Sequence, residues 1–270
     1  MFRAVSNSYT GIKSYQNSLD QTSNNIANVN TNGHKKGHAS FNDLLYREIN
    51  DRRMSVSQDL EAQAPQGGKG SRVSSVTTSF EQGDMKETGR TLDLAIDGEG
   101  FFRVIRDDDT VAYTRDGTFF VDSNGDLVNA RGDYLDVPFG LSEYTMGDDE
   151  DRSVNNLMVG PDGSVHWKGG DEEEPEELGQ IELHRFMNPE GLESGGGNNY
   201  LETELSGGVL EGNPGEDGFG QIRQGFIEGS NVDLAEEMTN MIKDQSALQS
   251  STRAMRTSDE LWTMTLQAKV

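Results

Sequence analysis

Residues 231–266 read NVDLAEEMTNMIKDQSALQSSTRAMRTSDELWTMTL, and this stretch decides the fold expected for the chain. Apolar residues recur in it at every seventh position, and a second, half-polar series lies four positions further on. The first series is Leu234, Met241, Leu248, Met255 and Trp262; the second is Met238, Gln245, Thr252, Asp259 and Leu266. This spacing is typical of the a and d positions of a coiled-coil helix. Gly and Pro are absent from it, so we expect one long helix.

The ends and the polar positions of this stretch add detail. Either Asn231 or Asp233 can cap the N-terminus, and Asp233 has Glu236 three residues on, as in a capping box. Burial of a Leu or Met side chain contributes about 1.5–3 kcal/mol. The polar members of the second series do not provide this stabilisation, and they require polar partners when they are buried. We therefore expect this helix to be marginal alone and to need other helices around it.

The start of the chain offers a first partner helix. Apolar residues again recur at every seventh position, namely Val5, Ile12, Leu19 and Ile26, with the half-polar series Ser8, Tyr15, Thr22 and Val29 three further on. Gly11 costs this helix about 1 kcal/mol relative to Ala. Two interpretations stay open. The two ends pair within one chain, or their apolar faces, which together form an assembly seam, are completed by neighbouring subunits.

Composition excludes several classes of protein. Of 270 residues only 32% are hydrophobic, 32 are Gly, and the mean hydropathy is −0.71, so we expect a modest core with loops and terminal helices. A net charge of −24 argues against nucleic acid and anionic membrane as partners. The chain has no Cys, no run of 18 apolar residues and no apolar signal region at its start. This combination fits either a cytosolic protein or a substrate of a signal-less export machine.

The middle of the chain predicts short strands. Leu92, Leu94 and Ile96 alternate with polar or small residues, and turns are marked by Asp116-Gly117 and Asn124-Gly125. We therefore predict an α+β fold. Residues 1–36 and 228–270 form a helical, coiled-coil-type terminal domain, residues 37–80 an extended linker or arm with a short helical piece at 41–46, and residues 81–227 a β-rich domain of hairpins or a barrel.

No pattern in the sequence predicts an active site, a cofactor site or a metal site. Gly98-Glu99-Gly100 lacks the third glycine and the helix of a dinucleotide motif. Asp122, Asn124 and Asp126 resemble the start of a calcium loop, but Leu127 stands where the loop requires Gly, so a hairpin turn is expected there. His34 and His38 are four residues apart but flank glycines where a helix is not expected. We expect a protein without catalytic residues, cofactor or metal.

Four motifs in order resemble the bacterial flagellar rod and hook protein family. They are residues 23–35 (SNNIANVNTNGHK), residues 88–102 with 113–117 and 127–132 (TG, LDLAIDGEGFF, YTRDG, LVNARG), residues 224–242 (QGFIEGSNVD, EM and MI) and residues 257–261 (TSDEL). The matching positions are Asn25, Ala27, Asn28, Thr31, Gly33, Lys35, Gly98, Gly100, Phe101, Phe102, Ser230 and Asn231. His34 stands where the family usually has Phe or Tyr, and residues 246–249 depart from its Arg-Ala-Tyr-Glu run.

The resemblance implies a structural subunit of the flagellar basal-body rod, which is not an enzyme. It implies export by the flagellar type III apparatus beyond the cytoplasmic membrane, self-assembly into a helical tube through the terminal helices, and partners among the other rod and hook proteins. Within the family, the length of the chain resembles the distal rod protein or its close rod paralogue. The alternative is a hook subunit or a secreted regulator of rod growth.

Overall fold

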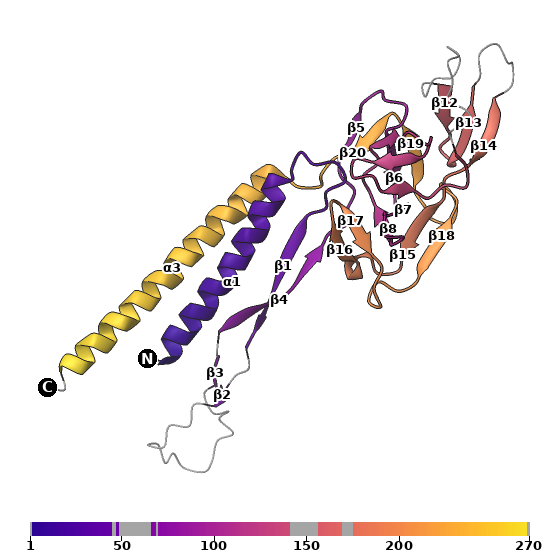
Figure 1. The fold of residues 1–270 in the computed structure, drawn as a ribbon. Coiled ribbons are helices and arrows are strands. Elements are labelled where there is room, and N and C mark those ends of the chain that lie inside the picture. Colours follow the sequence, from indigo (N-terminus) through magenta and orange to yellow (C-terminus); the bar gives the residue numbers. More distant parts are fainter. Residues whose placement is uncertain are drawn as a thin grey trace. The chain divides into compact units, whose positions relative to one another are not determined.

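The computed structural model describes residues 2–44, 47–48, 66–68, 70–140, 156–168 and 175–268. They form an α+β fold with a long helix near each end, α1 (Phe2–Ala27) and α3 (Leu234–Gln267), and short strands between them (Figure 1). The predicted fold class is thus confirmed at this level. The chain divides into two compact units, a helical unit (residues 1–26, 37–77 and 233–270) and a β-rich unit (residues 27–36 and 78–232).

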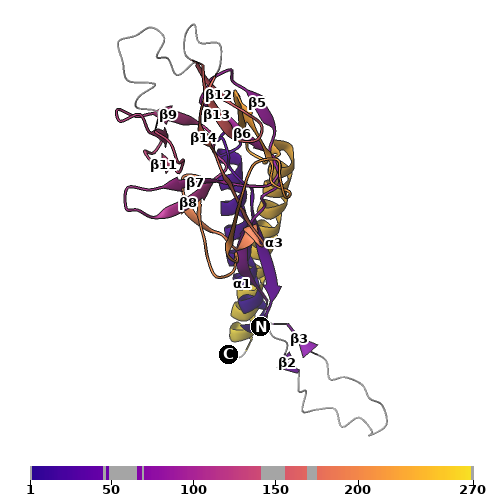
Figure 2. The same ribbon diagram turned by 90° about the vertical axis from the view of Figure 1, so that its right-hand side faces the viewer.

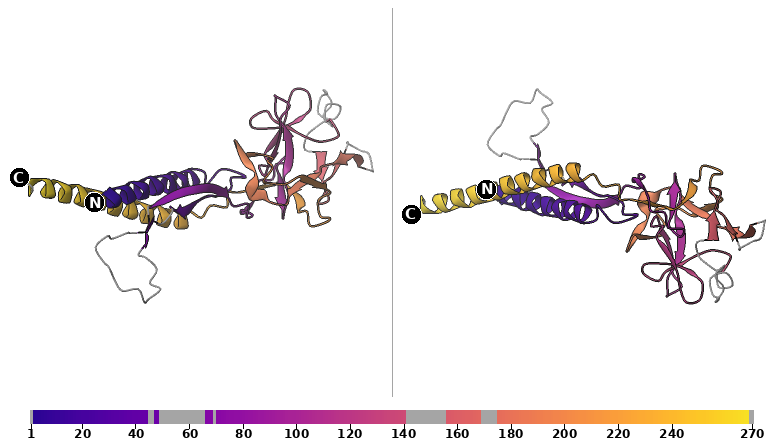
Figure 3. Two further views of the ribbon diagram at one scale, coloured as in Figure 1. Left: turned by 90° about the horizontal axis from the view of Figure 1, so that it is seen from below. Right: turned by 90° about the horizontal axis from the view of Figure 1, so that it is seen from above.

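The helical unit places α1 and α3 side by side and antiparallel (Figures 1 and 3). It also contains β1 (Gly37–Asp43), which pairs with β4 (Ser71–Thr78), and the short pair β2 (Arg47–Glu48) and β3 (Gln66–Gly67). The cap of α3 is Asp233, whose Oδ1 accepts from the backbone N–H groups of Ala235 (2.8 Å) and Glu236 (3.2 Å). This contact satisfies donors that an α-helix leaves free at its start.

The predicted helical piece at residues 41–46 is wrong, because Phe41–Asp43 end strand β1. Strand β1 is fixed by tertiary contact: Gly37 and Ala39 are buried, and a Cβ at Gly37 would collide with the side chain of Gln21 on α1. Residues 45–46, 49–65 and 69 of the expected arm lie outside the described residues.

The unit boundaries differ from the expected domain boundaries. Residues 27–36 group with the β-rich unit, where the Gly33 N–H donates to the carbonyl of Glu228 (2.8 Å). Residues 37–77 group with the helices, where the Ser14 hydroxyl donates to the carbonyl of Ser71 (3.3 Å). Hydrogen bonding to distant segments, rather than sequence continuity, therefore decides where each segment belongs.

The β-rich unit is built from antiparallel sheets, and most of their strands are labelled in Figures 1 and 2. The largest has the order β16-β17-β8-β7-β11-β10-β9. Its strands are β7 (Phe102–Ile105), β8 (Val111–Thr114), β9 (Phe119–Val121), β10 (Leu127–Asn129), β11 (Tyr134–Leu135), β16 (Glu193–Gly196) and β17 (Asn199–Leu201). Because β16 and β9 are its two edges, this sheet is open, and the described strands do not form the closed barrel that was one expectation.

Four further groups of elements complete the β-rich unit. A three-stranded sheet contains β12 (Leu157–Val159), β13 (Ser164–Trp167) and β14 (Glu176–Gln180). The pairs are β15 (Leu183–Phe186) with β18 (Val209–Gly212), β19 (Gln221–Gln224) with β6 (Leu94–Asp97), and β20 (Phe226–Glu228) with β5 (Met85–Glu87). A 3-10 helix, η2 (Pro189–Gly191), follows β15.

Two apolar clusters form the core of the β-rich unit. The larger is centred on Phe102, Phe119 and Ile222, all at most 1% exposed. The smaller is aromatic and includes Phe101, where edge-to-face ring contacts link it to Phe186. Strand alternation produces this division, because consecutive residues point to opposite faces. Among the described residues no helix is long and apolar enough to cross a membrane.

Candidate functional site

The N-terminal motif folds into a tight loop directly after α1. Thr31 donates its backbone N–H to the carbonyl of Asn28 (3.1 Å) and its hydroxyl to the side chain of Asn28 (3.1 Å). Gly33 has φ +66°, and a Cβ there would lie 2.7 Å from the backbone nitrogen of Asp116. Both the conformation and the close approach require glycine. The loop is thereby pressed against the Arg115–Asp116 backbone.

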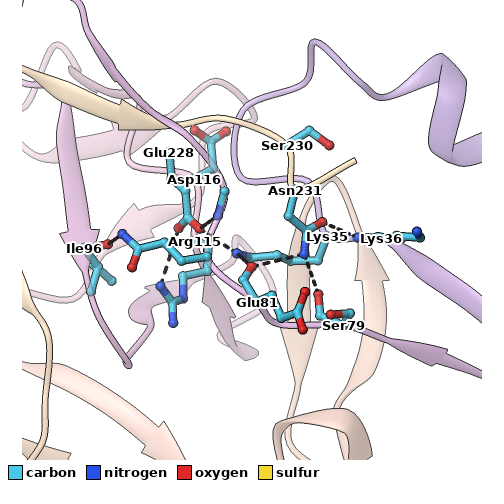
Figure 4. A network of polar contacts seen from close by, with 12 residues as sticks. Lys35, Lys36, Ser79, Glu81, Ile96, Arg115, Asp116, Glu228, Ser230 and Asn231 are labelled. Carbon is cyan, nitrogen blue, oxygen red and sulfur yellow. Dashed lines mark hydrogen bonds and ion pairs between the residues drawn. The ribbon is translucent and has the colours of Figure 1, made fainter. Parts of the chain in front are cut away.

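Lys35, at the end of this loop, enters a buried ion-pair network that we call the motif junction, formed by Lys35, Arg115, Glu228 and Asn231 (Figure 4). Lys35 Nζ lies 2.6 Å from Glu228 Oε1 and donates to the carbonyl of Glu81 at 2.7 Å. Arg115 Nη1 lies 3.5 Å from Glu228 Oε2. One carboxylate from β20 therefore pairs with a cation from the N-terminal motif and with another from the central motif.

The charges of the motif junction are almost completely removed from water. The side chains of Lys35 and Glu228 are 0% exposed, and that of Arg115 is 4% exposed. Burial lowers the pKa of Lys35 and the pKa of Arg115, and in both cases the Glu228 carboxylate opposes this shift. A further hydrogen bond offsets part of the cost of removing the Glu228 carboxylate from water, because Oε1 also accepts the N–H of Gly83 (2.8 Å). The stability of the junction thus depends on Glu228.

Asn231 closes the junction with a single side-chain amide. Its Oδ1 accepts the backbone N–H of Lys36 (2.7 Å), and its Nδ2 donates to the carbonyls of Ser79 (3.0 Å) and Glu81 (3.1 Å) (Figure 4). The neighbouring Ser230 hydroxyl accepts the N–H of Val232 (3.3 Å). Asn231 therefore joins three segments that are far apart in sequence, which explains why an amide with both donor and acceptor is suited to this position.

The central motif supplies the floor of the junction. Gly98, at φ +119°, offers its carbonyl to Arg115 (2.9 Å), and a Cβ there would lie 2.8 Å from Gly220 Cα. The Arg115 guanidinium lies over the ring of Phe101, 5.1 Å from its centroid. Gly100 is at φ +141°, and a Cβ added there would lie 3.3 Å from the Leu183 side chain. Phe102 points away into the larger core.

In the helical unit, polar pairs spaced by seven residues join α1 to α3. Ser18 Oγ donates to Asp244 Oδ2 (2.7 Å), and Asn25 Nδ2 donates to Glu237 Oε2 (3.1 Å). One heptad earlier, Gly11 faces Ser251, whose Oγ would lie 3.5 Å from an added Cβ. Asn25 also exchanges two hydrogen bonds with the backbone of Gly37 (2.9 and 3.1 Å). Asn25 and Glu237 are each only 2% exposed.

The residues predicted for the assembly seam are distributed over two environments. Half-buried members are Val5, Ile12, Leu19, Ile26, Met241, Leu248 and Met255. Exposed members are Leu234, Met238, Trp262 and Leu266. Ala27, in the last turn of α1, is also exposed. Within the chain, the seam therefore covers part of the helix surface and leaves a substantial apolar area in contact with solvent.

The two segments that were considered as metal sites, the 122–126 turn and the His34–His38 pair, are described by their contacts and exposure. Asp122 Oδ1 accepts the N–H groups of Asn124 (2.8 Å) and Asp126 (2.9 Å) in the turn from β9 to β10, so the predicted hairpin turn is confirmed. His34 is half-buried, where burial lowers its pKa and a hydrogen bond with Asn198 opposes this shift. His38 is exposed on β1.

Sequence reasoning gave no role to Arg115, Glu228 or Glu237, which the structure buries at the centres of the two polar networks. Each lies within or near a motif, but the chain has 47 acidic residues, and nothing in the sequence distinguishes a buried Glu from an exposed one. For Glu228, the available signal was its place in the otherwise small or apolar segment GFIEGS (residues 225–230), because a charge in such a segment is seldom buried unless it is paired.

Comparison with known proteins supplies the context of these networks. A family model described as "Flagellar hook protein FlgE/F/G D1 domain" matches residues 95–167, and one described as "Flagellar basal body rod FlgEFG protein C-terminal" matches residues 223–268. The flagellar basal-body rod protein FlgG of Borreliella burgdorferi is 40% identical, over 97% of this chain and 96% of its own length. That of Bacillus subtilis is 36% identical, over 97% of both chains. The flagellar hook protein FlgE of Borreliella burgdorferi is 23% identical, over 97% of this chain and 98% of its own length.

Proposed function

Because the chain belongs to the family of flagellar basal-body rod proteins, we propose that it builds the distal rod by polymerising through α1 and α3. The family is structural and not enzymatic, and it is located in the flagellar basal body, beyond the cytoplasmic membrane. The rod relatives are 34–40% identical, against 23% for the hook protein, which favours a rod subunit over a hook subunit.

The observation that carries the proposal is the exposed apolar surface of α3. Seven large apolar side chains of this helix are 43–63% exposed: Leu234, Met238, Ile242, Leu261, Trp262, Met264 and Leu266. Burial stabilises by about 25 cal/mol for each Å² of apolar surface removed from water. Surface of this kind marks an interaction site when several such residues are contiguous along one element. A helical neighbour that covers them supplies the apolar contacts that the polar α1–α3 line lacks.

The register of α1 and α3 explains why the end of α3 extends past α1. The pairs Gly11–Ser251, Ser18–Asp244 and Asn25–Glu237 fix an antiparallel register. In this register Phe2 stands opposite Glu260, so the last turns of α3 extend past the start of α1. Leu261, Trp262, Met264 and Leu266 lie in that overhang. Seven residues of helix correspond to about 10 Å, enough to reach a helix of an adjacent subunit.

The partners and the route of the subunit follow from the same proposal. Contacts with other copies of the chain form the tube, and rod and hook proteins adjoin it at its two ends. Passage through the flagellar type III apparatus delivers the subunit beyond the cytoplasmic membrane. The fold is compatible with passage of an extended chain, because it contains no cysteine and hence no disulfide.

A substitution in the seam tests the proposal. Leu248→Asp places a carboxylate on the half-buried seam of α3, and in the polymer it is buried without a partner in every subunit, at a cost of several kcal/mol each. We expect loss of polymer in sedimentation and electron microscopy, with Trp167 emission still native. The exposed β9–β10 turn residue Ser123 offers a control for the added charge, Ser123→Asp. A Leu248→Asp protein that polymerises like this control excludes the seam as the assembly surface.

Trp262 offers a second test. It is 43% exposed, whereas Trp167 is 6% exposed, so Trp167→Phe leaves one solvated indole as reporter. We expect emission of this variant to be red-shifted in dilute protein and to move to shorter wavelength as polymer forms, because assembly buries the indole. Emission that stays red-shifted in sedimented polymer shows that the overhang of α3 takes no part in subunit contacts.

A further inference from the structure

Strands β15 and β18 bring together one histidine and two glutamates in the β-rich unit. His184 and Glu211 are direct partners across the antiparallel pair. Glu182 lies two residues before His184, and alternate residues of an extended chain lie on the same face. One ligand atom from each of the three side chains lies within 4.8 Å of the other two. No other such group of three His, Asp or Glu side chains occurs among the described residues.

The His184 ring is buried without a good hydrogen bond. Its residue is 2% exposed, and neither ring nitrogen has a hydrogen-bond partner of normal geometry among the described residues. Nε2 lies 3.5 Å from Glu211 Oε1, longer than the usual range of about 2.7–3.2 Å. For a tetrahedral Zn²⁺ with bonds of about 2.0–2.1 Å, neighbouring ligand atoms lie about 3.3–3.4 Å apart. The observed separation is close to that spacing.

The charges around the ring also suit a cation. Glu182 and Glu211 are both exposed at the edge of the pair, and Asp136 is near enough to act on the ring. The positive side chain of Arg103 adjoins the group: it forms an ion pair with Asp136 and lies 2.9 Å from Glu211 Oε1. Each carboxylate oxygen has two lone pairs, so Glu211 Oε1 can accept from Arg103 with one and face the ion with the other. The Arg103 contact then orients the ligand, as outer partners of metal ligands commonly do.

From this geometry we propose that Glu182, His184 and Glu211 form a binding site for one divalent transition-metal ion, with Zn²⁺ as the representative ion. Imidazole with carboxylates favours Zn²⁺ and its neighbours over Mg²⁺ and Ca²⁺, which prefer oxygen ligands only. A fourth position is open to water, because Glu182 and Glu211 lie at the surface.

Such an ion gives the β-rich unit a cross-link between two strands. The β15–β18 pair is a sheet of only two strands, and two-stranded pairs are weakly stable by themselves. Metal bound to the folded unit and not to the unfolded chain stabilises the folded unit by mass action. The ion is therefore expected to be structural.

The test is calorimetric titration of the full-length protein with Zn²⁺ at pH 7.5 in excess Mg²⁺, which occupies unspecific carboxylates on this acidic chain. We expect one Zn²⁺ per chain and a higher unfolding temperature with Zn²⁺. Glu182→Gln and Glu211→Gln are surface changes that leave the core intact, and each should weaken Zn²⁺ binding at least tenfold. The control is Glu190→Gln, which removes the same charge at an exposed position of η2 and should bind like the parent protein.

Three outcomes overturn the proposal. They are the absence of a saturable one-to-one phase, equal affinity of Glu182→Gln and Glu190→Gln, and an unfolding temperature unaffected by Zn²⁺. A second readout uses Co²⁺, whose visible absorption reports a nitrogen and oxygen ligand set. The Co²⁺ spectrum should disappear in His184→Gln. If it persists in that variant, provided the variant is folded by circular dichroism, the ion lies elsewhere.

Discussion

Replacing Glu228 by Gln should be among the most destabilising single changes in the β-rich unit. The amide keeps the shape and can still accept the N–H of Gly83, but it removes the carboxylate that faces Lys35 and Arg115 in the motif junction. Removing one partner of a buried ion pair costs about 3–5 kcal/mol. The short charge-assisted hydrogen bond from Lys35 to Glu228 alone accounts for about 1.5–3 kcal/mol of this figure. With side chains 0–4% exposed, water cannot compensate for the loss.

The assay is urea denaturation followed by Trp167 emission, in a Trp262→Phe background so that Trp167 is the only indole. Glu204→Gln, at an exposed position, is the control and should change the free energy of unfolding by less than about 0.5 kcal/mol. Lys35→Met combined with Glu228→Gln should cost less than the sum of the single changes, by at least about 1 kcal/mol. A loss below about 1 kcal/mol for Glu228→Gln, or additive single changes, refutes the network as described.

Two further predictions concern the loop after α1. Gly33→Ala should destabilise the β-rich unit by about 2–4 kcal/mol, because it combines positive φ with a clash against the backbone. The control is Gly132→Ala, at φ +90° in open space, which should cost only about 1 kcal/mol. Equal losses of unfolding free energy for the two variants in urea denaturation would contradict the clash. His34→Phe should reduce acid sensitivity. Because burial lowers the pKa of His34, the unfolded state binds its proton first, so the parent protein loses stability as pH falls below about 6.5. Unfolding temperatures measured from pH 7.5 to 5 should therefore diverge between the two proteins, and parallel curves would exclude His34 as the cause.

The elements that sequence predicted well are those whose causes are local. The seven-residue spacing predicted the extent of α3, and its cap, Asp233, was one of the two candidates that the sequence offered. Gly33 was identifiable for a similar reason, since a loop that ends a helix often requires positive φ. The missed strand β1 had no local signal, because its place is decided by contact of Gly37 with Gln21 on α1.

The polar networks could not be predicted because their partners are remote. Lys35 was named from the motif, but Glu228 stands 193 residues away, and one sequence contains nothing that pairs these two positions. The same holds for Asn25 and Glu237, which are 212 residues apart. Apolar periodicity shows which face of a helix packs against other apolar surface. The hydrogen-bond partners of a polar side chain depend instead on which distant segment the fold places beside it.

The long separation between Lys35 and Glu228 has a consequence for the timing of synthesis. At about 5–20 residues per second, the ribosome adds Glu228 about 10–40 s after Lys35. During this interval the lysine has no carboxylate to pair with in its native position, and the loop that contains it lacks the Gly33 bond to the Glu228 backbone. The motif junction therefore forms only after residue 228 has been added. A nascent chain that stops before residue 228 has neither the Lys35–Glu228 ion pair nor the hydrogen bond from Gly33 to the Glu228 carbonyl.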